Sequence, residues 1–415
     1  MTELRAFAER VLFGATLADK LAAPGDLVDD APGPALVAAP GAPGRPAALR
    51  LERAPDARAE PPPSEGRLDD PRARGRLLHA FANHELLALE LFALALLRFP
   101  DAPAGFRLGL GRVMQEEQAH LAAYLARMEA LGVRFGDEAP SAFFWTSLAP
   151  TRSPQELVAG LSLTFEQANL DFAAHFAAVL RRVGDEETAA LLDRVLADEV
   201  GHVRHGLTWF ERWRDPATSC WEAYVAALPP PLVPRRARGK GALQREARRA
   251  AGLPDDFVRR LALAGESTGR TPVVHVFLPG FEEALAGEPP SPAAEQVRRD
   301  QAALPVFLAR RGDVVLVPEA PDPAWLEALA AAGVEPPELV TSVDDLRGRP
   351  LSGLAPWGWD PTARALLAPL VGQARGEAPD PARTGELASK VTAAGWRRAQ
   401  LEAHPAWAAV VGPDA

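Results

Sequence analysis

Residues 113–124 have the sequence VMQEEQAHLAAY, and residues 192–205 have the sequence LDRVLADEVGHVRH. In both stretches a glutamate precedes a histidine by three positions within an apolar series of helical spacing. Side chains at positions i and i+3 of a helix project from the same face. Each stretch therefore predicts a helix that turns one carboxylate and one imidazole toward the protein interior. The four residues are Glu117, His120, Glu199 and His202.

Two further glutamates make this pattern an internal repeat. Glu85 and Glu166 each lie on the apolar stripe of an upstream segment with helical spacing. Glu85 precedes the glutamate of the first motif by 32 residues, and Glu166 precedes that of the second by 33. The two upstream glutamates are 81 residues apart and the two histidines are 82 apart. The chain thus repeats a glutamate followed by Glu-x-x-His.

The four segments predict long helices with defined ends. Pro100 stops the first helix, Gly132 ends the second, and Ser153 followed by Pro154 begins the third. The expected helices cover residues 72–98, 104–131, 154–184 and 185–213. Short connections within each pair and a longer middle connection predict two antiparallel hairpins. A four-helix bundle follows, with the four glutamates at similar heights.

Four carboxylates buried together in apolar stripes are strongly unfavourable without counter-charge. Two divalent cations would balance the four charges, and two neutral imidazoles would complete their coordination. Oxygen-rich ligation with one histidine per metal favours iron or manganese over a structural zinc site. The expected ligands are Glu85, Glu117, His120, Glu166, Glu199 and His202. Asp198, next to Glu199, is expected to accept a hydrogen bond from a histidine of the facing helix.

With these motifs the chain resembles the ferritin-like di-iron carboxylate superfamily. The stretches HELLALEL (84–91), EEQAH (116–120) and DEVGHVRHG (198–206) are similar to the ferritin-like family called domain of unknown function 455. The N-terminal stretches FAERVLFGATLADKL and APGRP extend this resemblance over about residues 1–264. The resemblance implies a four-helix bundle and a dinuclear metal centre. Relatives in the superfamily include tRNA-modifying hydroxylases, desaturases, ribonucleotide reductase radical subunits, rubrerythrins and ferritins.

The expected function is an O2-dependent oxidase or monooxygenase that acts on a small-molecule or peptide substrate. Its cofactor would be two iron ions, or alternatively manganese or a mixed Mn/Fe pair. An external electron donor is expected, since no flavin or nicotinamide motif is visible. Iron storage or peroxide scavenging is an alternative, and a tRNA-modifying hydroxylase is another. The enzyme is favoured because over half of the chain lies outside the predicted bundle.

Other polar residues near the motifs have weaker assignments. Tyr124 follows His120 by four positions, a spacing that resembles the radical tyrosine of ribonucleotide reductase small subunits, although a core tyrosine is the favoured interpretation. His205 is an alternative extra ligand. Glu90 is expected to be solvated or to support the ligands, and Glu116 to point off the ligand face. Packing, surface or structural roles are expected for His79, His84 and His175.

The remaining segments predict a multidomain, mainly α protein, with a small α/β domain after the bundle. Residues 1–70 should hold one short helix within 1–20 and a Pro/Ala/Gly-rich arm, and residues 71–215 the bundle. Residues 216–269 form a basic helical extension. Its basic cluster is expected to be a solvated helix face, or alternatively a site for an anionic substrate or nucleic-acid phosphate. The cluster comprises Arg235, Arg236, Arg238, Lys240, Arg245, Arg248 and Arg249.

In residues 270–415 the apolar pattern changes to short buried runs. Strands are expected at 273–278, 314–317 and 339–341, with helices at 293–303 and 323–332, which predicts a mainly parallel sheet. The segments LSGLAPWGWDPTARALLAPL and ELASKVTAAGWRRAQL resemble the pre-ATP-grasp region of ATP-grasp ligases. We expect this domain to bind a substrate or a separate ATP-grasp protein, or only to stabilise a homodimer. ATP binding by this chain alone is not expected, because it has no P-loop or GxGxxG motif.

Composition excludes several classes of protein. The 415 residues are 47% hydrophobic and 24% charged with a net charge of −10, which is typical of a soluble protein of several domains. This charge argues against a non-specific nucleic-acid binder. The longest apolar stretch, residues 86–97, is well short of the roughly 20 residues of a membrane span. A charged N-terminus and a single cysteine, Cys220, predict a cytoplasmic protein.

Overall fold

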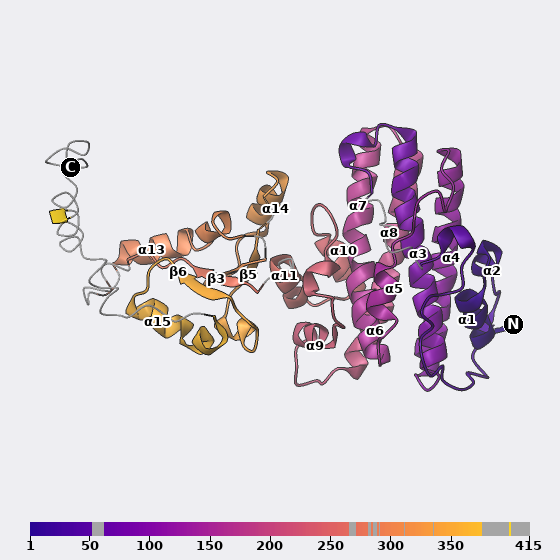
Figure 1. Cartoon of the computed structure of the whole chain (residues 1–415), viewed down its shortest axis with the longest axis horizontal. Helices are drawn as coiled ribbons and strands as arrows, with labels where there is room; N and C mark the ends of the chain where they lie inside the picture. Colours follow the sequence, from indigo (N-terminus) through magenta and orange to yellow (C-terminus); the bar gives the residue numbers. More distant parts are fainter. Residues whose placement is uncertain are drawn as a thin grey trace. The chain divides into compact units, whose positions relative to one another are not determined.

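The structure is a computed structural model of the chain, which divides into two compact units, Met1–Ala262 and Leu263–Ala415. The units are mainly helical, with a small sheet in the second (Figure 1). The structure describes all residues except 52–61, 265–270, 281–283, 285–288, 290, 311, 335, 376–397 and 400–415.

Two helical hairpins form the centre of the first unit. Helix α3 packs along α4, α7 packs along α8, and α4 also contacts α8 (Figure 1). Ser153 and Asp185, at the predicted starts of the third and fourth helices, each accept a backbone N–H bond from the first turn. Asp70, which was not predicted as a cap, does the same for α3. The four helices are α3 (Pro71–Arg98), α4 (Ala104–Ala130), α7 (Gln167–Arg182) and α8 (Glu186–Trp213).

The third predicted helix is interrupted, which corrects the expectation of one regular helix over 154–184. Helix α6 (Pro154–Gly160) leads into a π-helical segment, η3 (Leu161–Glu166), and α7 follows. The hydroxyl of Thr164 donates to the carbonyl of Ala159 at 2.7 Å, which satisfies a buried acceptor within the changed winding. Short π-helical segments inside α-helices are frequent at functional sites. Glu166 is the last residue of this one.

The N-terminal segment contains two short helices where one was predicted. Thr16 and Asp19 form a capping box that starts the second helix after a break at Gly14. The first helix buries its apolar face, including Phe7 and Val11, and packs on α3. The described residues of the arm contain only short elements, as its composition predicts. These elements are β1 (Thr2–Glu3), α1 (Leu4–Phe13), α2 (Leu17–Leu21), β2 (Leu27–Val28), η1 (Ala47–Leu49) and η2 (Glu65–Arg67).

Connecting segments cover the flanks of the hairpins. The longer connection between the hairpins contains α5 (Phe143–Leu148), which contacts α3. After α8 the chain forms α9 (Cys220–Ala227), η4 (Pro234–Ala237), α10 (Arg245–Ala251) and α11 (Asp255–Leu263). Arg248 of this extension is fully buried, so the prediction that the basic cluster is a solvated helix face is wrong for this residue. Arg248 binds both carboxylate oxygens of Asp171, at 2.6 and 2.9 Å.

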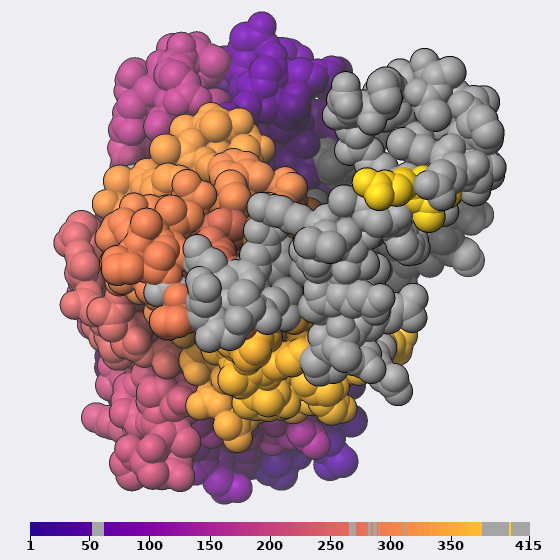
Figure 2. All heavy atoms as spheres, turned by 90° about the vertical axis from the view of Figure 1, so that its left-hand side faces the viewer, coloured from indigo at the N-terminus to yellow at the C-terminus, as the bar shows by residue number. Residues whose placement is uncertain are grey.

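The second unit contains a parallel sheet of four strands in the order β5-β4-β3-β6. Three strands match the predicted apolar runs, whereas β6 was not predicted as a strand. Figure 2 shows the described surface of this unit in orange and yellow. Its elements are β3 (Val273–Val276), α13 (Pro292–Asp300), η5 (Leu304–Phe307), β4 (Val314–Leu316), α14 (Pro323–Ala331), β5 (Glu338–Val340), η6 (Val343–Leu346), β6 (Gly353–Pro356), α15 (Pro361–Leu367) and η7 (Ala368–Gln373). Apart from residues 398–399, the segment ELASKVTAAGWRRAQL lies outside the described residues.

Among the described helices, only α3 is long and apolar enough to cross a membrane by length and composition. Within its most apolar window, 89% of the residues are buried inside the protein. A helix buried in this way has the properties of a core helix, whose apolar surface is covered by other helices.

Candidate metal centre

The six predicted ligand residues meet in the interior of the first unit. Four of them form one group, in which one donor atom from each residue lies within 4.8 Å of the others: Glu85, Glu117, His120 and Glu199. A second group, defined in the same way, contains Glu117, Glu166 and His202. Glu117 belongs to both groups, and all six side chains are buried. Two adjacent ions that share one carboxylate would fit this arrangement.

Most of the inner donor atoms have no hydrogen-bond partner. Both carboxylate oxygens of Glu117 and of Glu166 are buried without a hydrogen-bond partner, as are Oε2 of Glu199 and Nδ1 of His120 and His202. Several of these atoms are close polar neighbours of one another, since Nδ1 of His202 lies 3.1 Å from Glu117 and 3.4 Å from Glu199. Buried polar atoms are nearly always hydrogen-bonded in folded proteins. A concentration of unsatisfied oxygen and nitrogen donors that face one another therefore fits divalent cations, which would bind these atoms directly.

The outer nitrogens of the two histidines are held by carboxylates from the facing helix. Nε2 of His120 lies 3.0 Å from Asp198, as the sequence predicted. Nε2 of His202 lies 2.7 Å from Glu116. In each pair the neutral imidazole donates its Nε2–H to the carboxylate. The lone pair of Nδ1 then points toward the centre, and this tautomer is the one that a metal ligand needs.

Glu116, which was expected to point off the ligand face, binds the outer nitrogen of a predicted ligand histidine. It and Asp198 each directly precede a predicted ligand glutamate, and each binds the histidine of the other hairpin. The symmetry of the repeat was the signal that could have identified this pair, because the two acids occupy equivalent positions.

Burial and mutual repulsion raise the pKa of two of the four carboxyl groups, Glu117 and Glu166. Burial by itself would raise the pKa of Glu85, but hydrogen bonds with Glu117 and His120 outweigh burial and lower the pKa. Burial, together with the charges of Glu199 and Glu85, raises the pKa of Glu166 to about 8. Burial and the nearby Glu85 also raise the pKa of Glu117 well above its usual range. Burial by itself would lower the pKa of His120, but Glu85 and the surrounding acids raise it to about 9. Protons therefore neutralise part of the charge in the metal-free protein, and bound cations would replace them.

The family model described as "Protein of unknown function (DUF455)" matches residues 7–259, which include both hairpins and all six residues of the centre. The chain belongs to the DUF455 family. This match confirms the resemblance to the domain of unknown function 455. Searches of curated proteins and of solved structures gave no match.

One contact in the DUF455 centre was not predicted from the sequence. The amide nitrogen of Asn169 donates to Oε1 of Glu199 at 2.7 Å. This bond fixes the carboxylate so that its Oε2 remains free to face the other donors. Asn169 follows Glu166 by three positions, so both project from the same side of their helical segment.

Tyr124 and His205 lie outside the two groups of donor atoms. Tyr124 is 1% exposed, and burial together with Glu85, Glu199 and Glu117 raises the pKa of its hydroxyl. The ring of His205 stacks on Phe106 with 5.8 Å between centroids. Burial lowers the pKa of His205 to about 4, so its ring is neutral near neutral pH. His205 therefore packs against Phe106 and does not belong to either group of donor atoms, so the alternative that it is an extra ligand is not supported.

Two further buried acidic residues of the DUF455 fold, Glu90 and Asp171, form ion pairs with buried basic side chains. Glu90 is completely buried, which corrects its expected solvation, and it binds Lys20 at 3.0 Å and Arg45 at 2.6 Å. Asp171 lies 81 residues later and binds the buried Arg248 described above. Each acid follows a predicted ligand glutamate by five positions. The N-terminal arm and the C-terminal extension are thus anchored at equivalent points of the repeat.

His79, His84 and His175 lie outside the two donor groups and make packing and polar contacts. His79 packs against Phe135, and its Nε2 accepts a bond from the backbone N–H of Gly136 at 3.0 Å. His84 stacks on Phe144. His175 binds Glu65 at 2.9 Å.

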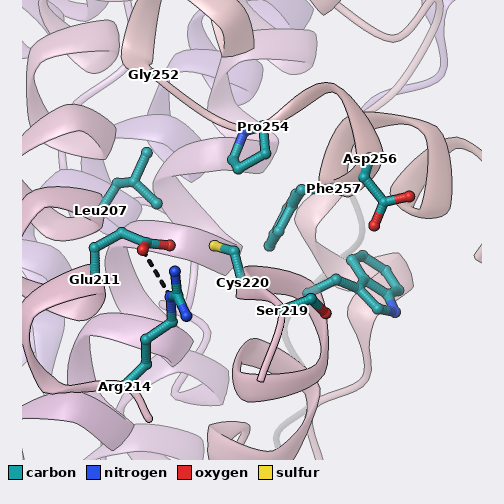
Figure 3. Close-up of a pocket in the computed structure, with 10 residues that line it drawn as sticks. Leu207, Glu211, Arg214, Ser219, Cys220, Gly252, Pro254, Asp256 and Phe257 are labelled. Carbon is teal, nitrogen blue, oxygen red and sulfur yellow. Dashed lines mark hydrogen bonds and ion pairs between the residues drawn. The ribbon is translucent and has the colours of Figure 1, made fainter. Parts of the chain in front are cut away.

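A separate hollow of about 360 Å³ lies between α8, α9 and α11 of the DUF455 fold (Figure 3). Its lining includes Leu207, Cys220 and Phe257, together with Glu211, which pairs with Arg214 at 2.6 Å. Burial and the adjacent Glu211 raise the pKa of the Cys220 thiol, so the thiol is protonated and a poor nucleophile. No predicted ligand lines this hollow, and we assign it no chemistry.

Proposed function

We propose that this DUF455 protein is a dinuclear iron or manganese oxidoreductase of the ferritin-like superfamily, and an O2-dependent oxidase or monooxygenase. In this proposal α3, α4, α7 and α8 form a ferritin-like four-helix bundle around the metal centre. The observation that carries the proposal is the pair of overlapping donor groups that share Glu117, in which most inner oxygen and nitrogen atoms lack a hydrogen bond.

The nature of the donors supports iron or manganese. The two groups offer four carboxylates and two imidazoles, with one imidazole in each group. Thiolates, which structural zinc sites commonly use, are missing from both groups. Carboxylate-rich sites with one or two imidazoles suit iron and manganese ions that must change oxidation state.

The protein residues would hold the metals, orient the ligands and exclude water. Glu117 belongs to both donor groups and would help to hold both ions, and Asp198 and Glu116 would orient the two imidazoles. Two reduced iron ions bound there would supply the electrons and the binding site that dioxygen needs. The leucine-rich surfaces of α3 and α8 would limit access of water to the centre. A separate protein would provide the external electrons.

Metal analysis of the purified full-length protein tests the proposal. Expression in iron-replete medium should give about two iron or manganese ions per chain. Glu117→Ala should lose both ions because Glu117 belongs to both groups, whereas Glu166→Ala should retain about one. The control is Glu129→Ala, which removes an exposed glutamate of α4. Stoichiometric zinc, or wild-type protein without metal, would contradict the proposal.

Oxygen consumption separates an oxidase from a storage protein. The reduced wild-type protein should consume O2 while its metal content stays near two ions per chain. A closed cage of many subunits with far more iron per chain would instead support storage. Specific tRNA binding by the wild-type protein would support the hydroxylase alternative.

We propose that the second unit binds a substrate or a partner, with a separately encoded ATP-grasp protein as one candidate, and that the chain acts in the cytoplasm. Removal of residues 266–415 should then abolish partner or substrate binding and leave metal content unchanged. A change in homodimer formation alone would instead support a stabilising role.

A further inference from the structure

Three aromatic rings from α3, α5 and η3 form a continuous stack. Phe144 of α5 is nearly parallel to Phe165 of η3, with an angle of 6° and 3.7 Å between centroids. The opposite neighbour is His84 of α3, at 15° and 4.7 Å. Two rings cannot share one face of Phe144 at these distances without overlapping. Phe144 therefore lies between His84 and Phe165.

Two rings of the stack belong to residues that directly precede predicted metal ligands in the sequence. His84 directly precedes Glu85, and Phe165 directly precedes Glu166. On the α4 and α8 side, the charged carboxylates of Glu116 and Asp198 bind the outer nitrogens of the two histidines. On the α3 and η3 side, Phe144 is a single uncharged ring contributed by a short connecting helix. The contacts of the Phe144 ring with His84 and Phe165 are stacking contacts that another flat ring can replace.

Positive charge lies beside the stack. Phe143 makes an edge contact with Phe165, at 5.9 Å between centroids, and the guanidinium of Arg236 lies 4.9 Å from the centre of the Phe143 ring. Arg236 is exposed, and the segment 229–245 around it contains no acidic residue. Lys240 of this segment is already paired with Glu65. A guanidinium that lies over a ring keeps its N–H groups available for an anion at its edge.

We propose that His84, Phe144, Phe165 and Arg236 form the binding slot for a planar, anionic organic substrate of the metal centre. A flat conjugated ring of the substrate takes the place of Phe144 between His84 and Phe165. The negative group of the substrate binds Arg236. Phe144 occupies the slot when the substrate is absent and closes the centre to water. The inference rests on the proposed function and specifies the chemical class of its substrate.

Three probe molecules test the slot in the full-length protein by titration calorimetry. They are 2-naphthoate, which is planar and anionic, cyclohexanecarboxylate, which is anionic but not planar, and 2-naphthol, which is planar and neutral near pH 7. The wild type should bind 2-naphthoate at least about tenfold more tightly than either control, because only this probe can both stack and pair with Arg236. Equal affinity for all three, or no binding of 2-naphthoate by any variant, would overturn the proposal.

Variants identify the residues that bind the probe. Phe144→Ala should bind 2-naphthoate about fivefold more tightly, because no ring competes for the slot. Arg236→Gln should bind 2-naphthoate about tenfold more weakly. The control is Arg152→Gln, which removes an exposed arginine just before α6 and should leave the affinity unchanged. Phe144→Leu provides a second test if the alanine variant does not fold. Unchanged affinity in both the Phe144 and Arg236 variants would overturn the proposal.

The same titration with metal-free and cobalt(II)-loaded protein separates this inference from the proposed function. The slot is built from side chains, so the metal-free protein should also bind 2-naphthoate. In the cobalt(II) protein the visible absorption bands should shift when the probe binds next to the centre. Binding without a shift would overturn the link to the centre. Failure to bind cobalt(II) would contradict the metal centre, whereas the metal-free titration would still decide whether the slot exists.

Discussion

Glu116 on α4 lies 2.7 Å from Nε2 of His202 on α8. The repeat places Asp198 and His120 in the reciprocal arrangement, at 3.0 Å. Each hairpin therefore orients the imidazole of the other. Both hairpins have to be in place before either imidazole is fixed, so assembly of the hairpins and formation of the centre are linked.

These two outer carboxylates should tune metal affinity. Glu116→Ala and Asp198→Ala should each weaken metal binding about 10–100-fold, because the imidazole loses the group that fixes its orientation. Competition with a fluorescent chelator measures the affinity. Glu116→Gln keeps an acceptor oxygen and should recover part of the loss. The prediction is wrong if Glu116→Ala binds metal as tightly as Glu129→Ala, the exposed control on the same helix.

Glu90→Gln should destabilise the full-length protein by about 3–5 kcal/mol, because Lys20 and Arg45 would remain buried without a carboxylate. Urea unfolding of the metal-free protein measures the effect. The matched control is Glu9→Gln, which breaks the exposed pair between Glu9 and Arg5 and should cost less than about 1 kcal/mol. A similar small loss in both variants would show that the buried cluster does not anchor the arm.

Stability should fall in weakly acidic solution because of His79. Burial lowers the pKa of His79 below its ordinary value of 6.5, and its Nε2 must be unprotonated to accept the bond from Gly136. As the pH falls below 6.5, the unfolded chain binds a proton that the folded chain does not, so unfolding becomes more favourable. Between about pH 7 and pH 5, wild-type protein should lose up to about 1 kcal/mol more stability than His79→Gln.

Urea titrations of the two metal-free proteins at several pH values measure this difference. Other histidines, including His205, are present in both proteins and cancel in the comparison. An identical pH dependence would exclude His79 as a contributor.

Two helical glycines should respond in opposite ways to alanine. A Cβ at Gly109 of α4 would lie 2.1 Å from the ring of His205, so Gly109→Ala should destabilise the protein by about 1–3 kcal/mol. A Cβ at Gly201 of α8 meets no atom within 4 Å, so Gly201→Ala should stabilise it by about 0.5–1 kcal/mol. Thermal unfolding of the two variants tests the pair. Stabilisation by Gly109→Ala would show that His205 can move aside at little cost.

The spacing of apolar and capping residues predicted the inward faces of the helices, the starts of two helices and the strands β3 and β4. The apolar stripes placed Glu85, Glu117, Glu166 and Glu199 on inward faces, and Ser153 and Asp185 marked helix starts that the structure confirms. The apolar runs of β3 and β4 were equally visible, because buried parallel strands have continuous hydrophobic sequences.

Other features depend on neighbours that are distant in the sequence. The helical spacing suggested that Glu90 is solvated, because it lies off the apolar stripe. In the structure Glu90 is buried because Lys20 and Arg45 of the N-terminal arm pair with it, and a buried charge is stable only with such a partner. Helical spacing also could not reveal the π-helical turn before Glu166, because this winding has no distinct apolar pattern.

The sequence by itself determined which residues face the interior of the helices and which chemistry they offer. Only the tertiary structure decided that Glu116 meets His202 and that Phe144 enters between His84 and Phe165. The physical reason is that periodicity fixes the direction of a side chain relative to its own helix. The identity of its partner depends on how separate helices and connecting segments pack together.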